Sequence, residues 1–336
     1  MRALELARLE GLLEAFAGLR LLVVGDLVLD EYVFGEVERI SPEAPVPVVQ
    51  VREEAQALGG AGNVARNVIA LGGRVELCAV VGDDAAGRRV AELVKEQDID
   101  PEGLVVAPGR PTTRKTRVIA RAQQVVRFDR ESVEPSPFAV DRRLGAALAR
   151  AIPRVAGAIV EDYGKGILSR RNAAAVMRRF QAAELPVAVD PKGLVAPWRG
   201  AALVKPNLRE AEALSGVAIR SQADLARAAG KLRRQIGGGA VVVTQGGEGM
   251  TLFDAEHEGV RVRTAAREVF DVQGAGDTTI AGLALALRAG ASLLEAAVLA
   301  NAAAGVVVGK VGTATASAAE VRELLPDAIA AAQAPT

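Results

Sequence analysis

Residues 271–287 read DVQGAGDTTIAGLALAL, a run of small residues that leads into an apolar helix. The backbone N–H groups of Gly274, Ala275 and Gly276 can approach a ligand closely, and the helix N-terminus presents partial positive charge to it. Asp277 follows in the first turn, where a carboxylate beside a bound phosphate can accept the proton of an attacking hydroxyl. The segment therefore predicts an anion hole with an adjacent base. The same residues also suit an ordinary helix start with a favourably placed acid.

Upstream of this segment, short apolar runs alternate with longer helix-patterned stretches. This rhythm predicts an α/β fold with a mostly parallel sheet covered by helices on both faces. Ligands of such sheets bind outside the carboxyl ends of the strands, so we expect the chemistry in the turns that follow them. The candidate strands are Leu21–Val24, Val75–Val81, Ala158–Val160, Val187–Val189, Ala202–Val204 and Ala240–Thr244.

Two stretches, Tyr32–Val51 and Val105–Asp129, break this alternation because they are extended and lack a helical crossover. We interpret them as a small β lid, inserted at about residues 32–58 and 105–130 in one domain that spans residues 1–336. Irregular surface loops are the alternative, since prolines also punctuate loops.

Composition excludes several classes of protein. The 336 residues carry 41 basic and 41 acidic side chains, so no net positive field attracts nucleic acid or an anionic membrane. A single cysteine, Cys78, and a single histidine, His257, exclude an internal disulfide and a clustered histidine metal site. Acids interrupt the N-terminal apolar stretch, and no apolar run approaches the ~18 residues of a membrane span. We expect a cytoplasmic enzyme without nucleic-acid or membrane partners.

The 271–287 segment resembles the carboxy-terminal signature of the ribokinase-like (PfkB) sugar kinases, in which the aspartate after GAG is the catalytic base. Residues 59–65 (GGAGNVA) resemble a second signature of that family. Residues 207–210 (NLRE) resemble its N-x-x-E motif near Mg²⁺ and phosphate, and residues 243–246 (VTQG) resemble its nucleotide-binding strand end. The resemblance implies a ribokinase-like three-layer sandwich with a small β lid. Gln273 departs from the family, which usually has threonine there.

Within this family, the chain is most similar to kinases that act on D-glycero-β-D-manno-heptose 7-phosphate. The similarity implies ATP-dependent phosphorylation of the anomeric hydroxyl to the 1,7-bisphosphate, in ADP-heptose and lipopolysaccharide core biosynthesis. It also implies ATP and Mg²⁺, with a monovalent cation such as K⁺ near Asp271 and residues 309–312. Action on a different sugar or sugar phosphate is the alternative. The matching stretches are residues 25–30, 39–48 (RISPEAPVPV), 162–166 (DYGKG), 190–193 (DPKG) and 301–312.

A sugar phosphate needs carboxylates and amides for its hydroxyls and cations for the phosphate that does not react. Lys115 and Arg117, two apart in an extended stretch, share a face and can converge on one anion. Each candidate also has a structural alternative, as a turn, a cap or a solvated surface charge. The predicted substrate-binding residues are Asp26, Asp30, Gly60, Asn63, Lys115, Arg117, Gln124, Asp162 and Lys165.

The nucleotide side is predicted around the loop after the 240–244 run, where glycines admit phosphate or ribose closely. Glu210 is expected to bind Mg²⁺ through water, as the family motif implies, and Asn301 is expected near adenine by the same resemblance. The predicted nucleotide-binding residues are Lys192, Asn207, Glu210, Thr244, Gly246, Gly249 and Asn301.

Other enzyme classes fit less well. Residues 60–65 formally match the dinucleotide fingerprint G-x-G-x-x-A, but the charged residues 52–54 stand where an apolar strand should precede them, and the region where the acid is expected reads VVGD (80–83). No Walker A string occurs either. A sugar sensor on the same fold has no need of a base such as Asp277. Some relatives carry a fused nucleotidyltransferase with an H-x-G-H motif, but this chain has one histidine, so we expect kinase activity alone. Unpaired lid edges favour a homodimer.

Overall fold

Twelve strands form one sheet in the part of the chain that the computed structural model describes, residues 4–121, 123–266, 269–310 and 312–334. The main path runs β12-β11-β10-β9-β8-β7-β1-β3-β4. Its pairs are parallel except β10 with β11 and β11 with β12, which are antiparallel. The prediction of a mostly parallel α/β sheet is confirmed. The strands are β1 Arg20–Ile40, β2 Pro47–Gly60, β3 Arg74–Gly82, β4 Leu104–Ala107, β5 Thr113–Ala120, β6 Gln123–Arg130, β7 Gly157–Glu161, β8 Val187–Asp190, β9 Leu203–Val204, β10 Ala240–Thr244, β11 Met250–Phe253 and β12 Glu258–Val262.

Helices α3, α5, α6, α7, α9 and α10 begin where a short polar side chain accepts a free N–H group of the first turn. Helices α6, α9 and α10 start with capping boxes, in which a glutamate at the third position bonds back to the cap residue. Short 3₁₀ turns at residues 16–18, 101–103, 152–154, 196–198 and 246–248 join other elements. The helices are α1 Leu6–Ala15, α2 Ala61–Ala70, α3 Ala85–Glu96, α4 Phe138–Ala151, α5 Arg170–Ala182, α6 Leu208–Ser215, α7 Gln222–Ile236, α8 Ala275–Arg288, α9 Leu293–Val308 and α10 Ala318–Gln333.

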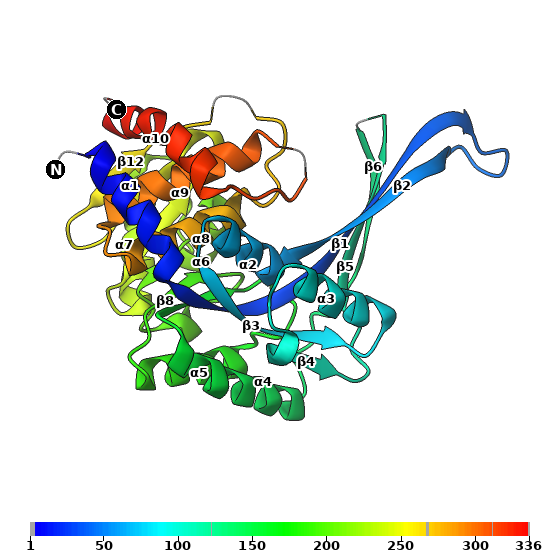
Figure 1. The fold of residues 1–336 in the computed structure, drawn as a ribbon, viewed down its shortest axis with the longest axis horizontal. Helices are drawn as coiled ribbons and strands as arrows, with labels where there is room; N and C mark the ends of the chain where they lie inside the picture. The colour runs from blue at the N-terminus through cyan, green and yellow to red at the C-terminus, as the bar shows by residue number, and fades with distance from the viewer. Residues whose placement is uncertain (1–3, 122, 267–268, 311, 335–336) are drawn as a thin grey trace.

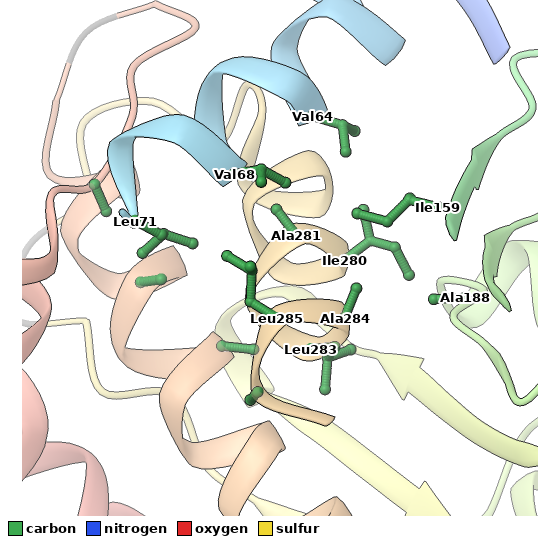
Figure 2. Packing of buried hydrophobic residues seen from close by; sticks show 14 of the residues in the cluster. Val64, Val68, Leu71, Ile159, Ala188, Ile280, Ala281, Leu283, Ala284 and Leu285 are labelled. Atoms are coloured by element: carbon green, nitrogen blue, oxygen red, sulfur yellow. The ribbon is translucent and has the colours of Figure 1, made fainter. Parts of the chain in front are cut away.

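Two hydrophobic cores, one on each face of the sheet, hold the three layers together. Helices α1, α2, α3, α8, α9 and α10 cover one face, and α4, α5 and α7 cover the other (Figure 1). Figure 2 shows α8 packed between α2 and the sheet, with Ile280 near Ile159 of β7. At Gly282 a Cβ atom would lie 3.0 Å from the Cα of Ala300, so glycine lets α8 approach α9 closely. This packing fixes the start of α8 against the strand ends.

The lid strands, which are β2, β5, β6 and the second half of β1, project from the main sheet (Figure 1). In the lid, β1 pairs antiparallel with β2 and parallel with β5, and β5 pairs antiparallel with β6. Strand β1 belongs to both parts: its residues 20–26 pair with β3 and β7, and from Val28 onward it pairs with β2 and β5. Both stretches that lack helices in the sequence therefore contain strands.

The second predicted insertion begins too early. Residues 104–107 form β4, which pairs in parallel with β3 and lies in the main sheet, so the projecting strands start only at Thr113. The residue pattern of the run LVVA does not distinguish a strand of the main sheet from a lid strand. Its pairing with β3 depends on contacts between residues that are distant in the sequence. No helix among the described residues is long and apolar enough to cross a membrane.

Candidate active site

The start of α8 carries the residues that the sequence predicts as an anion hole, Gly274, Ala275 and Gly276. Gly274 precedes the helix with a φ of +77°, and a Cβ atom there would lie 2.7 Å from Nδ2 of Asn63. Glycine is therefore required by both the left-handed backbone and the close approach of α2. The first N–H groups of a helix have no partner within it. The N–H of Ala275 makes a long bond of 3.4 Å to the carbonyl of Val272, and both Ala275 and Gly276 line a cavity of about 620 Å³.

Two cavities lie on either side of this helix start. The larger is lined by residues at the carboxyl ends of β7, β8 and β10 and by α8 and α9. The smaller, of about 180 Å³, lies between lid strands β1, β2 and β5 and the residues around the start of α8. Three residues, Tyr163, Gly274 and Asp277, line both cavities. The Asp277 carboxylate can therefore contact a molecule bound in either cavity.

Asp277 is 5% exposed and accepts two hydrogen bonds. Nδ2 of Asn63 donates to Oδ2 over 2.7 Å, and the hydroxyl of Tyr163 donates to Oδ1 over 3.0 Å. Burial raises the pKa of Asp277 to about 6, although the two hydrogen bonds oppose that rise. The carboxylate is therefore ionised at neutral pH and basic enough to take a proton.

A buried charged cluster, formed by Glu161, Asp190 and Lys205, lies beside Asp277. Nζ of Lys205 pairs with Oδ2 of Asp190 over 2.6 Å. Burial alone would lower the pKa of Lys205, but the two carboxylates outweigh it and raise that pKa. Burial, together with the charges of Asp190 and Asp277, raises the pKa of Glu161 well above its usual value. No sequence motif marks this cluster, although all three residues end a strand or follow one directly.

The smaller cavity collects the predicted sugar-side residues Asp30, Gly60, Lys115 and Arg117. Nη1 of Arg117 pairs with Oδ1 of Asp30 over 2.6 Å, and its guanidinium lies over the ring of Tyr32, 5.4 Å from the centroid. Nζ of Lys115 lies 3.5 Å from Oδ2 of Asp129. Two cations therefore share one side of a small cavity, as the spacing of Lys115 and Arg117 predicts.

Four predicted substrate residues do not line either cavity. Asn63, in α2, is 0% exposed and its side chain donates to Asp277. Asp26 is buried, and its Oδ2 accepts the backbone N–H groups of Tyr163 and Lys165 over 2.8 Å and 3.1 Å, so its side chain holds the turn after β7. Nζ of Lys165 pairs with Glu131 over 2.7 Å. Gln124 is exposed on β6.

Asp162, predicted on the sugar side, lines the larger cavity instead. Its Oδ1 accepts the backbone N–H of Gly164 over 2.8 Å, and its Oδ2 accepts that of Lys192 over 3.4 Å. Burial, followed by the charge of Asp26, raises the pKa of Asp162 to about 7. The carboxyl group therefore joins two strand-end turns.

All seven predicted nucleotide-side residues line the larger cavity. Asn207 and Glu210 form the capping box of α6, and Nζ of Lys192 lies 2.8 Å from Oε1 of Glu210. The side chain of Asn301 donates from Nδ2 to the carbonyl of Arg263 over 2.6 Å.

The carboxylates of the larger cavity suit a magnesium ion that arrives with a nucleotide. No group of three His, Cys, Asp or Glu side chains among the described residues could hold a metal ion by itself. Both oxygens of Glu210 are already engaged, by Lys192 and by the backbone N–H of Asn207. Mg²⁺ keeps several waters and is usually bound by substrate phosphates with few carboxylates. The donor set therefore fits contact of Glu210 with Mg²⁺ through water.

Asp271 and Gln273 join the anion-hole segment to its neighbours. The carboxylate of Asp271 accepts the backbone N–H of Gln273 over 2.9 Å and that of Gly312 over 3.0 Å. The hydroxyl of Tyr32 donates to Oε1 of Gln273 over 3.3 Å, so the residue that departs from the family pattern contacts the lid strand β1. Of the predicted cation-binding residues 309–312, Val311 lies outside the described residues.

Comparison with known proteins agrees with this geometry. The family model "pfkB family carbohydrate kinase" matches residues 19–320. The chain is 48% identical over 314 residues to the bifunctional protein HldE of Paramagnetospirillum magneticum, covering 93% of this chain and 64% of that protein. It is 46% identical over 319 residues to the bifunctional protein HldE of Geobacter metallireducens, covering 95% and 65%. The chain thus spans less than two thirds of the length of these relatives.

Solved structures show the same fold. The tetrameric inhibited form of phosphofructokinase-2 from Escherichia coli superposes with a TM-score of 0.75 at 20% identity, covering 92% of this chain and 98% of that one. Arabidopsis thaliana ribokinase complexed with ribose and ATP superposes with a TM-score of 0.71 at 20% identity, covering 91% and 98%. The predicted ribokinase-like fold is confirmed. The chain belongs to the pfkB family of carbohydrate kinases and is a sugar kinase.

Proposed function

We propose that this chain transfers the γ-phosphoryl group of ATP to the anomeric hydroxyl of D-glycero-β-D-manno-heptose 7-phosphate. The products are the 1,7-bisphosphate and ADP, on the route to ADP-heptose and the lipopolysaccharide core. The observation that supports this most is the position of Asp277, on the lining of both cavities and beside the N–H groups at the start of α8. The HldE relatives support a heptose substrate.

Transfer of a phosphoryl group depends mainly on positioning and on neutralising charge. In our proposal the larger cavity holds ATP, with its γ-phosphoryl over the N–H groups of Gly274, Ala275 and Gly276. Members of this family use ATP with a divalent metal, and Mg²⁺ on the nucleotide would neutralise phosphate charge, with Glu210 in contact through water. Asp277 takes the proton of the anomeric hydroxyl as that oxygen attacks in line.

The smaller cavity holds the sugar phosphate in this proposal. Asp30 and Asn63 bond sugar hydroxyls, and Lys115 and Arg117 bind the 7-phosphate, because charge-assisted hydrogen bonds to an anion are the strongest available. Asp30, Lys115 and Arg117 lie on lid strands and line this cavity, whereas Asn63 lies in α2 beside Asp277. The lid then covers the sugar and excludes water during transfer.

An ADP-release assay tests this function directly. Purified protein is supplied with MgATP and a panel of hexoses, heptoses and their 7-, 6- and 1-phosphates. We expect kcat/KM for D-glycero-β-D-manno-heptose 7-phosphate to exceed that for every other acceptor by at least about tenfold. Equal or greater turnover of another sugar phosphate would establish the alternative, a kinase of the same family with a different substrate.

Replacement of Lys115 by alanine is expected to raise KM for the sugar phosphate by about 10- to 100-fold, since a charge-assisted contact contributes about 1.5–3 kcal/mol. KM for ATP should change little because Lys115 does not line the larger cavity. Arg127→Ala is the matched control: Arg127 also pairs with Asp129 but does not line the smaller cavity. Steady-state kinetics of both variants measure the difference, and equal changes in KM would exclude Lys115 from the phosphate site.

We also propose that the chain forms a homodimer through the lid. Its projecting strands carry exposed apolar side chains that a partner would cover: Ile40, Val46, Val51, Val125, Val126 and Phe128. Sedimentation at micromolar concentration should give the mass of a dimer, and Phe128→Asp should weaken association. Phe138→Asp, at an exposed position on α4, is the control that should remain dimeric. A monomeric wild-type protein would contradict the proposal.

A further inference from the structure

The turn that follows β7 brings a phenol group to the carboxylate of Asp277. The hydroxyl of Tyr163 lies 3.0 Å from Oδ1, while Nδ2 of Asn63 lies 2.7 Å from Oδ2. The two donors come from different elements, and Tyr163 is 114 positions from Asp277 in the sequence. Tyr163 also lines both cavities. Its ring therefore stands at the boundary between the proposed nucleotide and sugar spaces.

A buried carboxylate holds this turn in place. The backbone N–H of Tyr163 donates to Oδ2 of Asp26, which is 1% exposed, and the N–H of Lys165 donates to the same oxygen. Asp162 accepts the N–H of Gly164 from the other side. Three backbone N–H groups of the turn are therefore held by two buried carboxyl side chains. The placement of the Tyr163 ring is thus built into the end of the sheet.

Tyr163 can only donate in this contact. The negative charge of Asp277, followed by burial and the charges of Glu161 and Asp190, raises the pKa of Tyr163 well above its usual value. The phenol therefore keeps its proton at every working pH. A carboxylate has about four acceptor sites, so two donors leave sites free for a further proton donor.

We propose that Tyr163 is a positioning residue that holds the ionised Asp277 carboxylate in the orientation that accepts the proton of the sugar hydroxyl. This inference rests on the proposed function. The proton passes from the hydroxyl to Asp277 as the oxygen attacks phosphorus, and the phenol proton stays on Tyr163. Tyr163 and Asn63 fix the two carboxylate oxygens from opposite elements, which restricts rotation of the group.

Other charged groups also face Asp277, and they set its proton affinity together with the two donors. Asp190 on β8 and Glu161 on β7 oppose its ionisation, whereas Lys205, after β9, favours it. All three remain in a variant that lacks only the phenol oxygen. A change in the titration of Asp277 in that variant therefore reports on the hydrogen bond from Tyr163.

The test is Tyr163→Phe, which keeps the ring between the cavities and removes only the hydroxyl. Loss of one hydrogen bond to a charged group should raise the apparent pKa of the acid limb of kcat/KM by about one unit. With a wild-type limb near pH 6, the loss of kcat/KM at pH 6 should then be about fivefold greater than the loss at pH 8.5. A purely structural role would reduce activity by the same factor at both pH values.

Tyr32→Phe is the matched control, because Tyr32 is the only other tyrosine of the chain and its hydroxyl contacts Gln273 rather than Asp277. Its acid limb should stay where the wild-type limb lies. An equal shift in both variants, or no shift in Tyr163→Phe, would overturn the inference. A shift in Tyr163→Phe alone would support it.

A readout without substrate separates this inference from the proposed function. Carbon-13 NMR titration of the aspartate carboxyl groups, with the Asp277 signal assigned by its loss in Asp277→Asn, gives the pKa of Asp277 directly. An upward shift in Tyr163→Phe would support the hydrogen bond even if the wild-type enzyme failed to phosphorylate the heptose. An unshifted signal in an active enzyme would overturn the role of Tyr163 and leave the proposed function intact.

Discussion

Asp277→Asn is expected to lower kcat by about 10²- to 10⁴-fold, which is the usual contribution of a positioned general base. Asparagine has nearly the same shape, and its single oxygen can still accept a hydrogen bond from Asn63 or from Tyr163, but it cannot take the proton of the attacking hydroxyl. The fold and the α8 N–H groups stay in place, so the Kd for ATP should change by no more than a few fold. Stopped-assay kinetics and nucleotide titration measure the two quantities separately.

Asp98→Asn is the control for this substitution. Asp98 is exposed at the end of α3, and its φ of +56° is one that asparagine adopts readily. Turnover of this variant should match the wild type. If Asp277→Asn kept a tenth or more of wild-type kcat, Asp277 would not be the base.

The pH dependence of the wild-type enzyme follows from the same carboxylate. Burial raises the pKa of Asp277 to about 6, and only its ionised form can take a proton. The value of kcat/KM should therefore be constant above neutral pH and should fall tenfold for each unit below about 6. This acid limb belongs to Asp277 and its charged neighbours as a coupled set.

Lys205→Met is expected to lower the free energy of unfolding by about 3–5 kcal/mol at pH 8, the usual cost of removing one partner of a buried ion pair. The Lys205 side chain is only 4% exposed, and its loss leaves Asp190 and Glu161 without a compensating cation. Methionine fills a similar volume without polar atoms. Urea denaturation of the variant and the wild type measures the difference.

This destabilisation should shrink as the pH falls. Burial raises the pKa of Asp190 and of Glu161 in the folded protein, so in that state they hold protons that the unfolded chain releases above pH ~4. The free energy of unfolding then decreases as the pH rises from the unfolded-state pKa of these acids to their folded-state pKa. Loss of Lys205 raises the folded-state pKa further, because Lys205 favours the ionised carboxylates. The difference between variant and wild type should be smaller at pH 5 than at pH 8.

Lys192→Met is the matched control for the ion pair. Lys192 also lies within 2.8 Å of a carboxylate oxygen, that of Glu210, but its side chain is 53% exposed. Exposed pairs contribute about 0–1 kcal/mol, so this variant should unfold nearly as the wild type does. Similar losses in both variants would show that burial of Lys205 has no special energetic effect.

The sequence predicts well those parts of the site that are local. The small residues before α8, the strand-end turns and the capping box of Asn207 and Glu210 are all set by neighbours within a few positions. The contacts of Lys205 and Tyr163, in contrast, join residues from different elements of the fold. Lys205 looks like a lysine at the end of a short apolar run, and only the parallel alignment of β8 with β9 brings it to Asp190.

The same limit explains the early start assigned to the second lid segment. Residues 104–107 have the apolar character of any short strand, and their place in the main sheet depends on pairing with β3. The sequence indicates part of the role of Tyr163, because this residue lies in a strand-end turn, where we expect functional residues. Its distance to Asp277 depends on how α8 packs against β7, which no local pattern specifies.

Strand β1 gives the lid a particular mechanical character. It runs without interruption from Arg20 in the main sheet to Ile40 at the tip, and its pairing passes directly from β3 and β7 to β2 and β5. No loop in β1 lies between the lid and the main sheet, so this strand contains no hinge. Any displacement of the lid would therefore have to bend this continuous strand itself.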